Sequence, residues 1–423
     1  MKILLTRAAG ACVLACWAVA GVAADSNAIS LREAIGLVTA RNPELAAFQP
    51  QATAAREQAA VQALAPPLSL DLQLENFAGS GELSGIDALE TTLQLSRLIE
   101  LGGKAQARRE LGEFEVERLT AEQRSRQADV LAEVAKRFVH VLADQEKLQA
   151  MQRAELLAEA ASASARSRVE AGAASPVQFS RAEIALARTR IDVEHAEHEL
   201  LASRVALSTQ WREESPQFGA AEGQLFALKE VEPFDAFAQR LQTNPDLLAF
   251  ASHDRVAEAR TRLAQSQQRP NLNLSFGVRR LEAFDDAAFV AGFSMPLSSR
   301  RRAQGEIRAA QAERESLALT REARRLELHA TLFGIYQELV HARTEAQALQ
   351  QRIRPQALDM LRTTEAGYRA GRFSFLELAD AQRQLLEIEL DAIRAATEFH
   401  TQLIELERLT GQPMTMVVDG ESP

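Results

Sequence analysis

Cysteine is almost absent from this chain of 423 residues, and aromatic residues are scarce. The two cysteines, Cys12 and Cys16, both lie near the N-terminus, in a segment that we expect to be removed. The mature chain would then have neither disulfides nor thiolate metal ligands. Aromatics make up 5% of the residues, which argues against thick aromatic cores and favours long helices with narrow apolar seams.

The N-terminal segment has the composition of an export signal. Basic residues precede the apolar stretch 8–20, and small residues follow it before Asp25. This order is typical of a secretory signal peptide, so we expect residues 1–24 to be cleaved and the protein to be exported. The sequence Val13-Leu14-Ala15-Cys16 leaves a lipoprotein alternative open, in which Cys16 is lipidated.

The remaining chain also lacks basic excess, long apolar runs and catalytic motifs. The formal net charge of the full chain is -10, and it becomes -12 without Lys2 and Arg7, which argues against nucleic acid as a partner. No run of 18 apolar residues follows the signal segment, so any membrane-spanning part would consist of strands. No P-loop, catalytic triad or metalloprotease helix stands out. We therefore expect no enzymatic activity and no cofactor.

The chain contains an internal duplication with a period of about 200 residues. The segment 40–48 returns as 242–250, with the same Asn-Pro pair, and 170–175 returns as 369–374. Each Asn-Pro should interrupt a helix, because proline lacks the backbone donor. We expect a first repeat over 25–211, a linker over 212–232, a second repeat over 233–411 and a tail over 412–423.

Each repeat carries a strand pattern between helical patterns. Residues 68–75 alternate leucine with polar residues, as in a strand with one apolar and one wet face. The expected hairpins span 68–98 and 271–296, the long helices 101–171 and 304–370, and the return helices 177–211 and 375–409. Pro355 should kink the second long helix. On the pattern alone, the hairpins could instead pack on a soluble core.

Helices of this length require neighbours, as in a coiled-coil bundle or a tube wall. Four strands are too few to close a barrel, whereas three chains would supply twelve. The segments 100–104 (Glu-Leu-Gly-Gly-Lys) and 366–382, together with the duplication, resemble the TolC family of outer-membrane efflux proteins. The glycine–lysine turn resembles its heavy-metal branch, the CzcC-like factors.

The resemblance implies a mainly α-helical fold with a small β part. A homotrimer would form a twelve-stranded β-barrel in the outer-membrane lipid and a helical tunnel through the periplasm. Its partners would be a periplasmic adaptor protein and an inner-membrane pump of the RND type. The channel would export heavy-metal cations such as cobalt, zinc, cadmium, nickel, copper or silver. The alternatives are multidrug efflux, type I protein secretion, or a soluble periplasmic coiled-coil scaffold.

Several residues are candidates for the periplasmic entrance. Glu377 and Asp380 lie three residues apart on one helical face, so three copies would place six carboxylates around an opening. The resemblance implies that Tyr368 helps to latch this entrance. Because Phe373 and Gln178 depart from the family pattern there, the pair Glu170 and Arg372 is our substitute latch.

The other candidates are turns and one histidine pair. By resemblance, Gly172, Ser175, Gly371 and Ser374 form the tips that contact the adaptor. Gly102 and Gly103 should allow the change from strand to helix. Lys104, Arg108 and Arg109 would then meet lipid head groups or begin a solvated helix. His195 and His198 could offer two metal ligands on one helix, but an exposed helix face explains them more simply.

Overall fold

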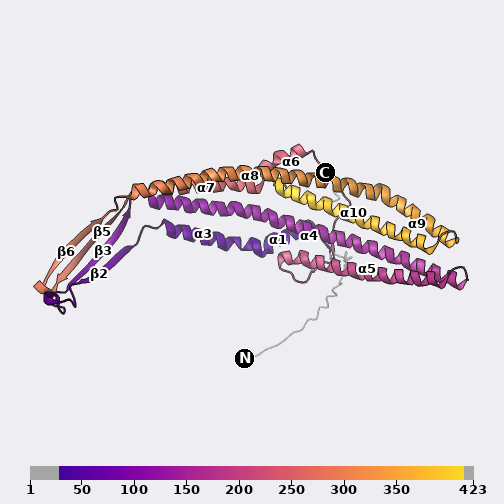
Figure 1. Cartoon of the computed structure of the whole chain (residues 1–423), viewed down its shortest axis with the longest axis horizontal. Helices are drawn as coiled ribbons and strands as arrows, with labels where there is room; N and C mark the ends of the chain where they lie inside the picture. Colours follow the sequence, from indigo (N-terminus) through magenta and orange to yellow (C-terminus); the bar gives the residue numbers. More distant parts are fainter. Residues whose placement is uncertain (1–27, 414–423) are drawn as a thin grey trace, which may run out of the picture.

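The computed structural model describes residues 28–413, which form a long, bent molecule (Figure 1). A four-stranded sheet lies at one end, and the tips of two helical hairpins lie side by side at the other. The first half contains β1 (Ala28–Ile29), α1 (Leu31–Arg41), α2 (Pro43–Ala46), α3 (Phe48–Ala63), β2 (Leu68–Glu75), β3 (Glu90–Glu100), α4 (Lys104–Glu170), α5 (Pro176–Ser208) and β4 (Ala220–Ala221). The second half contains α6 (Phe234–Arg240), α7 (Pro245–Ser266), β5 (Asn271–Leu281), β6 (Asp286–Ser294), α8 (Ser299–Ala348), α9 (Arg354–Arg369) and α10 (Phe375–Thr410). The prediction of a mainly helical fold with a small β part is confirmed. The signal segment 1–24 and most of the tail 412–423 lie outside the described residues.

The two Asn-Pro pairs begin helices in the same way in both halves. The Asn42 side chain accepts a hydrogen bond from Glu44 N, and Asn244 accepts one from Leu247 N. In each case proline takes the first helical position, where no donor is needed. The same asparagines donate to the carbonyls of Gln210 and Leu409. Each pair therefore ties the start of its half to the end of the return helix.

The strands of the larger sheet follow the order β2-β3-β5-β6 and are antiparallel throughout. Its centre is the pairing of β3 with β5, in which Leu93 lies opposite Val278 and Leu95 opposite Phe276. The two hairpins of the duplicated chain thus become one sheet. Its outer strands, β2 and β6, have no further partner within the described chain.

The long helices run from this sheet towards the tips. Helix α4 has 67 residues and therefore spans roughly 100 Å. The second long helix begins at Ser299, earlier than predicted, and a π-helical turn at Leu349–Ile353 divides it into α8 and α9. Pro355 is the second residue after this turn. Proline has no backbone donor, and its ring crowds a carbonyl of the preceding turn; a π turn accommodates both. The helix irregularity predicted at Pro355 is therefore a π turn.

Two of the three apolar cores combine residues of both halves, and the other lies within the second half. The largest surrounds Phe138 and Val139 at the middle of α4, and it includes Ile29 of β1 and Trp211. A second cluster joins α8 to α10, and a third lies near the tips around Tyr368. Within residues 28–413, every helix is too short or too polar to be a membrane span.

Candidate functional site

One face of the four-stranded sheet is apolar and uncovered. The register places leucines of β2 beside leucines of β3, and these beside aromatic and branched residues of β5 and β6. Leu70 is 68% exposed and Phe289 is 94% exposed. The exposed apolar members are Leu68, Leu70, Leu72, Leu74, Leu93, Leu95, Ile99, Phe276, Val278, Phe289 and Phe293. A contiguous apolar surface of this kind marks contact with a membrane or another protein.

The opposite face of the sheet is polar and internally paired. Arg279 forms ion pairs with Glu75 (3.2 Å) and Glu90 (2.7 Å), and its Nε donates to Thr92 Oγ1. Ser96 Oγ donates to Asp71 at 2.6 Å. Strands β3, β5 and β6 have nine to eleven residues, which matches the length of a tilted membrane-spanning strand, and β2 has eight. The alternation suits lipid on one side and water on the other.

At the junction between strand and helix, Gly102 and Gly103 have φ angles of +86° and +74°. A Cβ on Gly102 would lie 2.7 Å from Arg269 Cγ, so the close approach of the second half also requires glycine. The chain therefore turns from β3 into α4 at the predicted residues.

The basic residues after this turn are not available to lipid as predicted. Lys104 is only 3% exposed, and its Nζ donates to Asn271 Oδ1, at the start of β5. Arg108 pairs with Glu100 at 2.6 Å and donates to the Leu64 carbonyl. The head-group role is wrong for these two side chains, because they lock the junction internally. Arg109 alone of the three is exposed.

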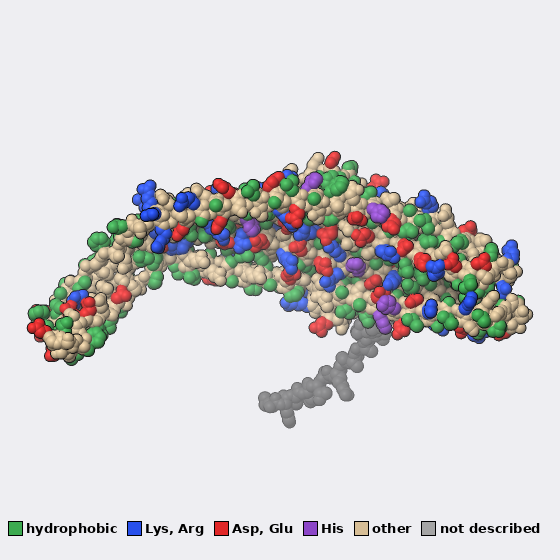
Figure 2. Space-filling model, viewed as in Figure 1, with side chains coloured by type: hydrophobic (Ala, Val, Ile, Leu, Met, Phe, Trp, Pro, Cys, Tyr) green, Lys and Arg blue, Asp and Glu red, His purple; other side chains and the backbone are tan. Residues whose placement is uncertain are grey.

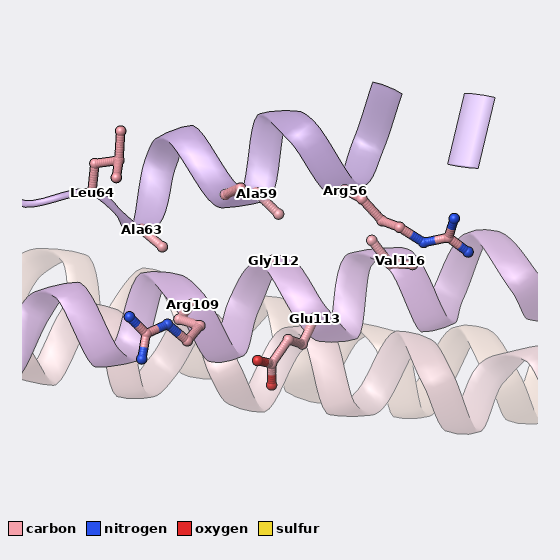
Figure 3. Close-up of a pocket in the computed structure, with 9 residues that line it drawn as sticks. Arg56, Ala59, Ala63, Leu64, Arg109, Gly112, Glu113 and Val116 are labelled. Carbon is pink, nitrogen blue, oxygen red and sulfur yellow. The ribbon is translucent and has the colours of Figure 1, made fainter. Parts of the chain in front are cut away.

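A shallow groove of about 510 Å³ lies between α3 and α4 below this junction (Figure 3). The two helices come close at Gly112, where an added Cβ would lie 2.5 Å from Ala59 Cβ. Apolar side chains such as Leu64 and Val116 line the groove, and Arg109 projects at its rim. It offers an amphipathic surface without a cluster of catalytic groups.

The tips of the helical hairpins are formed by two equivalent turns. Gly172 and Gly371 have φ angles of +70° and +74° and end α4 and α9. Ser175 Oγ accepts from Val177 N at 3.3 Å, and Ser374 Oγ accepts from Glu377 N at 3.3 Å. These four residues thus have a local role: each glycine allows the reversal, and each serine caps the next helix.

The two acidic residues at the second tip are both engaged within their own helix. Glu377 Oε2 accepts from Ser374 N at 2.6 Å, completing a capping box. This bond lowers the pKa of Glu377. Asp380 pairs with Arg383 and accepts from Gln384 at 2.7 Å. Arg383 offsets the charge of Asp380, so the acidic surface is weaker than the sequence alone indicates.

Tyr368 lies inside the tip rather than on its surface. It is 1% exposed and contacts Phe375 at a ring-centroid distance of 6.3 Å. The guanidinium of Arg168 lies 4.6 Å from the Tyr368 ring centroid, and its Nη1 donates to the Tyr368 carbonyl. Burial raises the pKa of Tyr368. The Arg168–Tyr368 contact joins the end of α4 to the end of α9, and hence the two hairpins.

The expected latch pair does not form within this chain. Among the described residues, Glu170 and Arg372 share no ion pair, and both are exposed. Sequence reasoning missed Arg168, which makes the contact instead. No motif marks this arginine, because its role depends on the packing of two hairpin tips that are distant in the sequence.

A buried charge cluster lies further from the tips. The side chain of Glu389 in α10 is 8% exposed and pairs with Arg153 of α4 at 3.2 Å and Arg354 of α9 at 2.9 Å. It therefore joins three helices just beyond the π turn.

The structure places the histidine pair on an exposed face of α5. His195 is exposed and lies 3.4 Å from Glu199, and His198 contributes no further ligand to it. Within residues 28–413, no group of three or more His, Cys, Asp or Glu side chains could hold a metal ion.

Comparisons with known proteins agree with this geometry. The family model described as "Outer membrane efflux protein" matches residues 34–211 and 237–412, and the chain belongs to this family. The two matched segments coincide with the two halves of the duplicated fold. The resemblance predicted from the sequence is thereby confirmed, and the protein is an outer-membrane efflux component.

Individual relatives extend this result. The chain is 29% identical over 323 residues to the cobalt-zinc-cadmium resistance protein CzcC of Cupriavidus metallidurans, covering 76% of this chain and 77% of CzcC. A membrane protein from Pseudomonas aeruginosa shares the fold with a TM-score of 0.74 and 18% identity, over 90% of this chain and 92% of that one. CusC gives a TM-score of 0.71 and 18% identity, also over 90% and 92%.

Proposed function

We propose that this protein is the outer-membrane duct of a tripartite system that exports heavy-metal cations. Its similarity to the cobalt-zinc-cadmium resistance protein over most of both chains carries the assignment of cargo. The partners would be a periplasmic adaptor and an inner-membrane RND pump, which supplies the energy. The duct itself would be passive, without cofactor or catalysis.

Three copies would complete the membrane-spanning part. The edge strands β2 and β6 present unpaired backbone groups, which a lipid environment does not tolerate. Pairing of β6 with β2 of the next copy would satisfy both edges and give a closed sheet of twelve strands. The apolar face would then contact lipid, and the face with Arg279 and Asp71 would line a water-filled passage.

The periplasmic entrance would lie at the hairpin tips. In this proposal the entrance would open by a movement of α9 and α10 relative to α4 and α5, which would break the contact between Arg168 and Tyr368. We propose this contact as a latch in place of the pair Glu170 and Arg372. The turns at Gly172 and Gly371 would meet the adaptor.

The cargo is tested by deleting the gene and measuring tolerance to cobalt, zinc, cadmium, nickel, copper and silver. We expect sensitivity to at least one of these ions, restored by the wild-type gene. Unchanged tolerance to all six would refute the metal cargo. Sensitivity to drugs or dyes alone would favour multidrug efflux, and loss of a secreted protein would favour type I secretion. Membership in the outer-membrane family displaces the soluble scaffold alternative.

A further inference from the structure

Three consecutive arginines begin helix α8, at the second junction between sheet and helices. Arg300, Arg301 and Arg302 are all exposed. Figure 2 shows basic side chains gathered where the sheet meets the helices. No ion pair reaches these three arginines from any other described residue. We call Arg300, Arg301 and Arg302 the arginine cluster.

The arginine cluster directly adjoins the uncovered apolar surface. Phe293 ends the apolar face of β6 and is 76% exposed. Met295 and Leu297 follow on the connection to α8, and Leu297 is 91% exposed. Only a few residues along the chain thus separate the apolar side chains from the guanidinium groups. A bilayer has the same order, with acyl chains in its interior and head groups at its surface.

The position of the cluster is unfavourable unless an anion is present. The first turn of a helix carries a partial positive charge, so cations there are repelled. Helix α8 has no acidic residue in its first turn and no side-chain cap on its first amides. An anion beside this turn would offset both the helix dipole and three guanidinium charges.

The equivalent junction of the first repeat has no such surface. There Lys104 is buried against Asn271 and Arg108 is neutralised by Glu100, so Arg109 is the one exposed residue of these three. The two halves share their fold but differ at this point, because the second junction leaves its cations in solvent. The cluster is therefore not a requirement of the turn from strand to helix.

We propose that the arginine cluster binds the phosphate of an anionic phospholipid in the periplasmic leaflet of the outer membrane, with the acyl chains against Phe293 and Leu297. This site rests on the proposed membrane insertion of the sheet. Guanidinium groups suit phosphate because they offer several donors in one plane. Each exposed cation near an anionic lipid surface strengthens binding about fivefold.

Native mass spectrometry of the full-length protein tests the site. The protein is released from nanodiscs with equal amounts of phosphatidylglycerol and phosphatidylcholine, and retained lipids are counted per chain. We expect wild type to retain phosphatidylglycerol preferentially. Arg300→Gln/Arg301→Gln/Arg302→Gln should lower this preference by roughly tenfold to a hundredfold. The matched control, Arg188→Gln/Arg362→Gln/Arg394→Gln, removes the same charge from helices far from the sheet and should retain the preference.

Further arms separate the explanations. The lysine triple variant at 300–302 should keep most of the preference, which confirms that folding is intact. Equal retention of both lipids by wild type, or unchanged preference in the glutamine variant, would overturn the site. Displacement of the lipid by inorganic phosphate would identify a soluble-anion site and also overturn it. A protein that binds phosphatidylglycerol through the cluster but conducts no ions in planar bilayers would support the site and refute the proposed duct.

Discussion

Replacing Arg168 by methionine should raise the conductance of the channel. Methionine keeps most of the apolar stem of Arg168 but removes the guanidinium that lies over the Tyr368 ring and bonds its carbonyl. A cation–π contact contributes about 0.5–2 kcal/mol, and a hydrogen bond from a charged donor about 1.5–3 kcal/mol. Arg168 is only half-buried, so we expect a net loss of about 1–2 kcal/mol per chain. This shifts the closed–open equilibrium of each chain roughly tenfold towards the open state.

Single-channel recording in planar bilayers measures this effect. The matched control is Tyr368→Phe, which keeps the ring but removes a buried hydroxyl that has no hydrogen-bond partner in the described chain. That variant should conduct like wild type and be at least as stable. If Arg168→Met inserts normally and its conductance equals that of wild type, the contact is not a latch. A Tyr368→Phe variant that opens the channel would also refute this reasoning, because it would assign the latch to the hydroxyl.

Three further perturbations test the packing of the helices. Gly367→Ala would place a Cβ 2.0 Å from Phe373 Cδ2, so it should destabilise the tip by about 1–3 kcal/mol. Thermal unfolding followed by circular dichroism measures this loss, and an unchanged Tm would contradict the prediction. Glu389→Gln leaves Arg153 and Arg354 without their shared carboxylate. Because both arginines can turn to water, we expect the free energy of unfolding to fall by about 1–2 kcal/mol. Denaturant titration measures this change, and equal stability would show that the cluster contributes nothing. Burial lowers the pKa of His400 below its ordinary value of 6.5, so the unfolded chain gains a proton on this residue first on acidification. The contribution of His400 to stability should therefore be constant well above pH 6.5 and fall below it, and His400→Gln should flatten that part of the Tm–pH curve.

The sequence predicts the main elements because their signals are local. Leucine alternation over 68–75 marks a strand, the two Asn-Pro pairs mark helix starts, and Gly172 and Gly371 mark reversals. Each of these depends on backbone preferences or periodicity within a few residues. The alternation also predicts which sheet face is apolar, and the exposed leucines of β2 agree.

The contacts between elements are where sequence reasoning fails. Lys104 looks like a free cation until β5 brings Asn271 against it. The sequence does not show that Tyr368 is buried, in contact with Phe375 of α10 and Arg168 of α4. Asn271 and Arg168 each come from the other half of the chain. Local patterns contain no information on how two repeats pack together, so burial and pairing at these positions required the structure.

The π turn at Leu349–Ile353 determines which way the side chains of α9 point at the second tip. A π turn holds one more residue than an α turn, and one residue corresponds to about 100° of rotation in a regular helix. Every side chain of α9 beyond it is therefore rotated relative to the seam of α8. Deleting Gln350 would restore a continuous α-helix. The Tyr368 side chain would then point away from its contacts with Arg168 of α4 and Phe375 of α10. A single inserted residue, about thirty ångströms along the helix from the tip, thus sets which face of α9 is directed into the bundle.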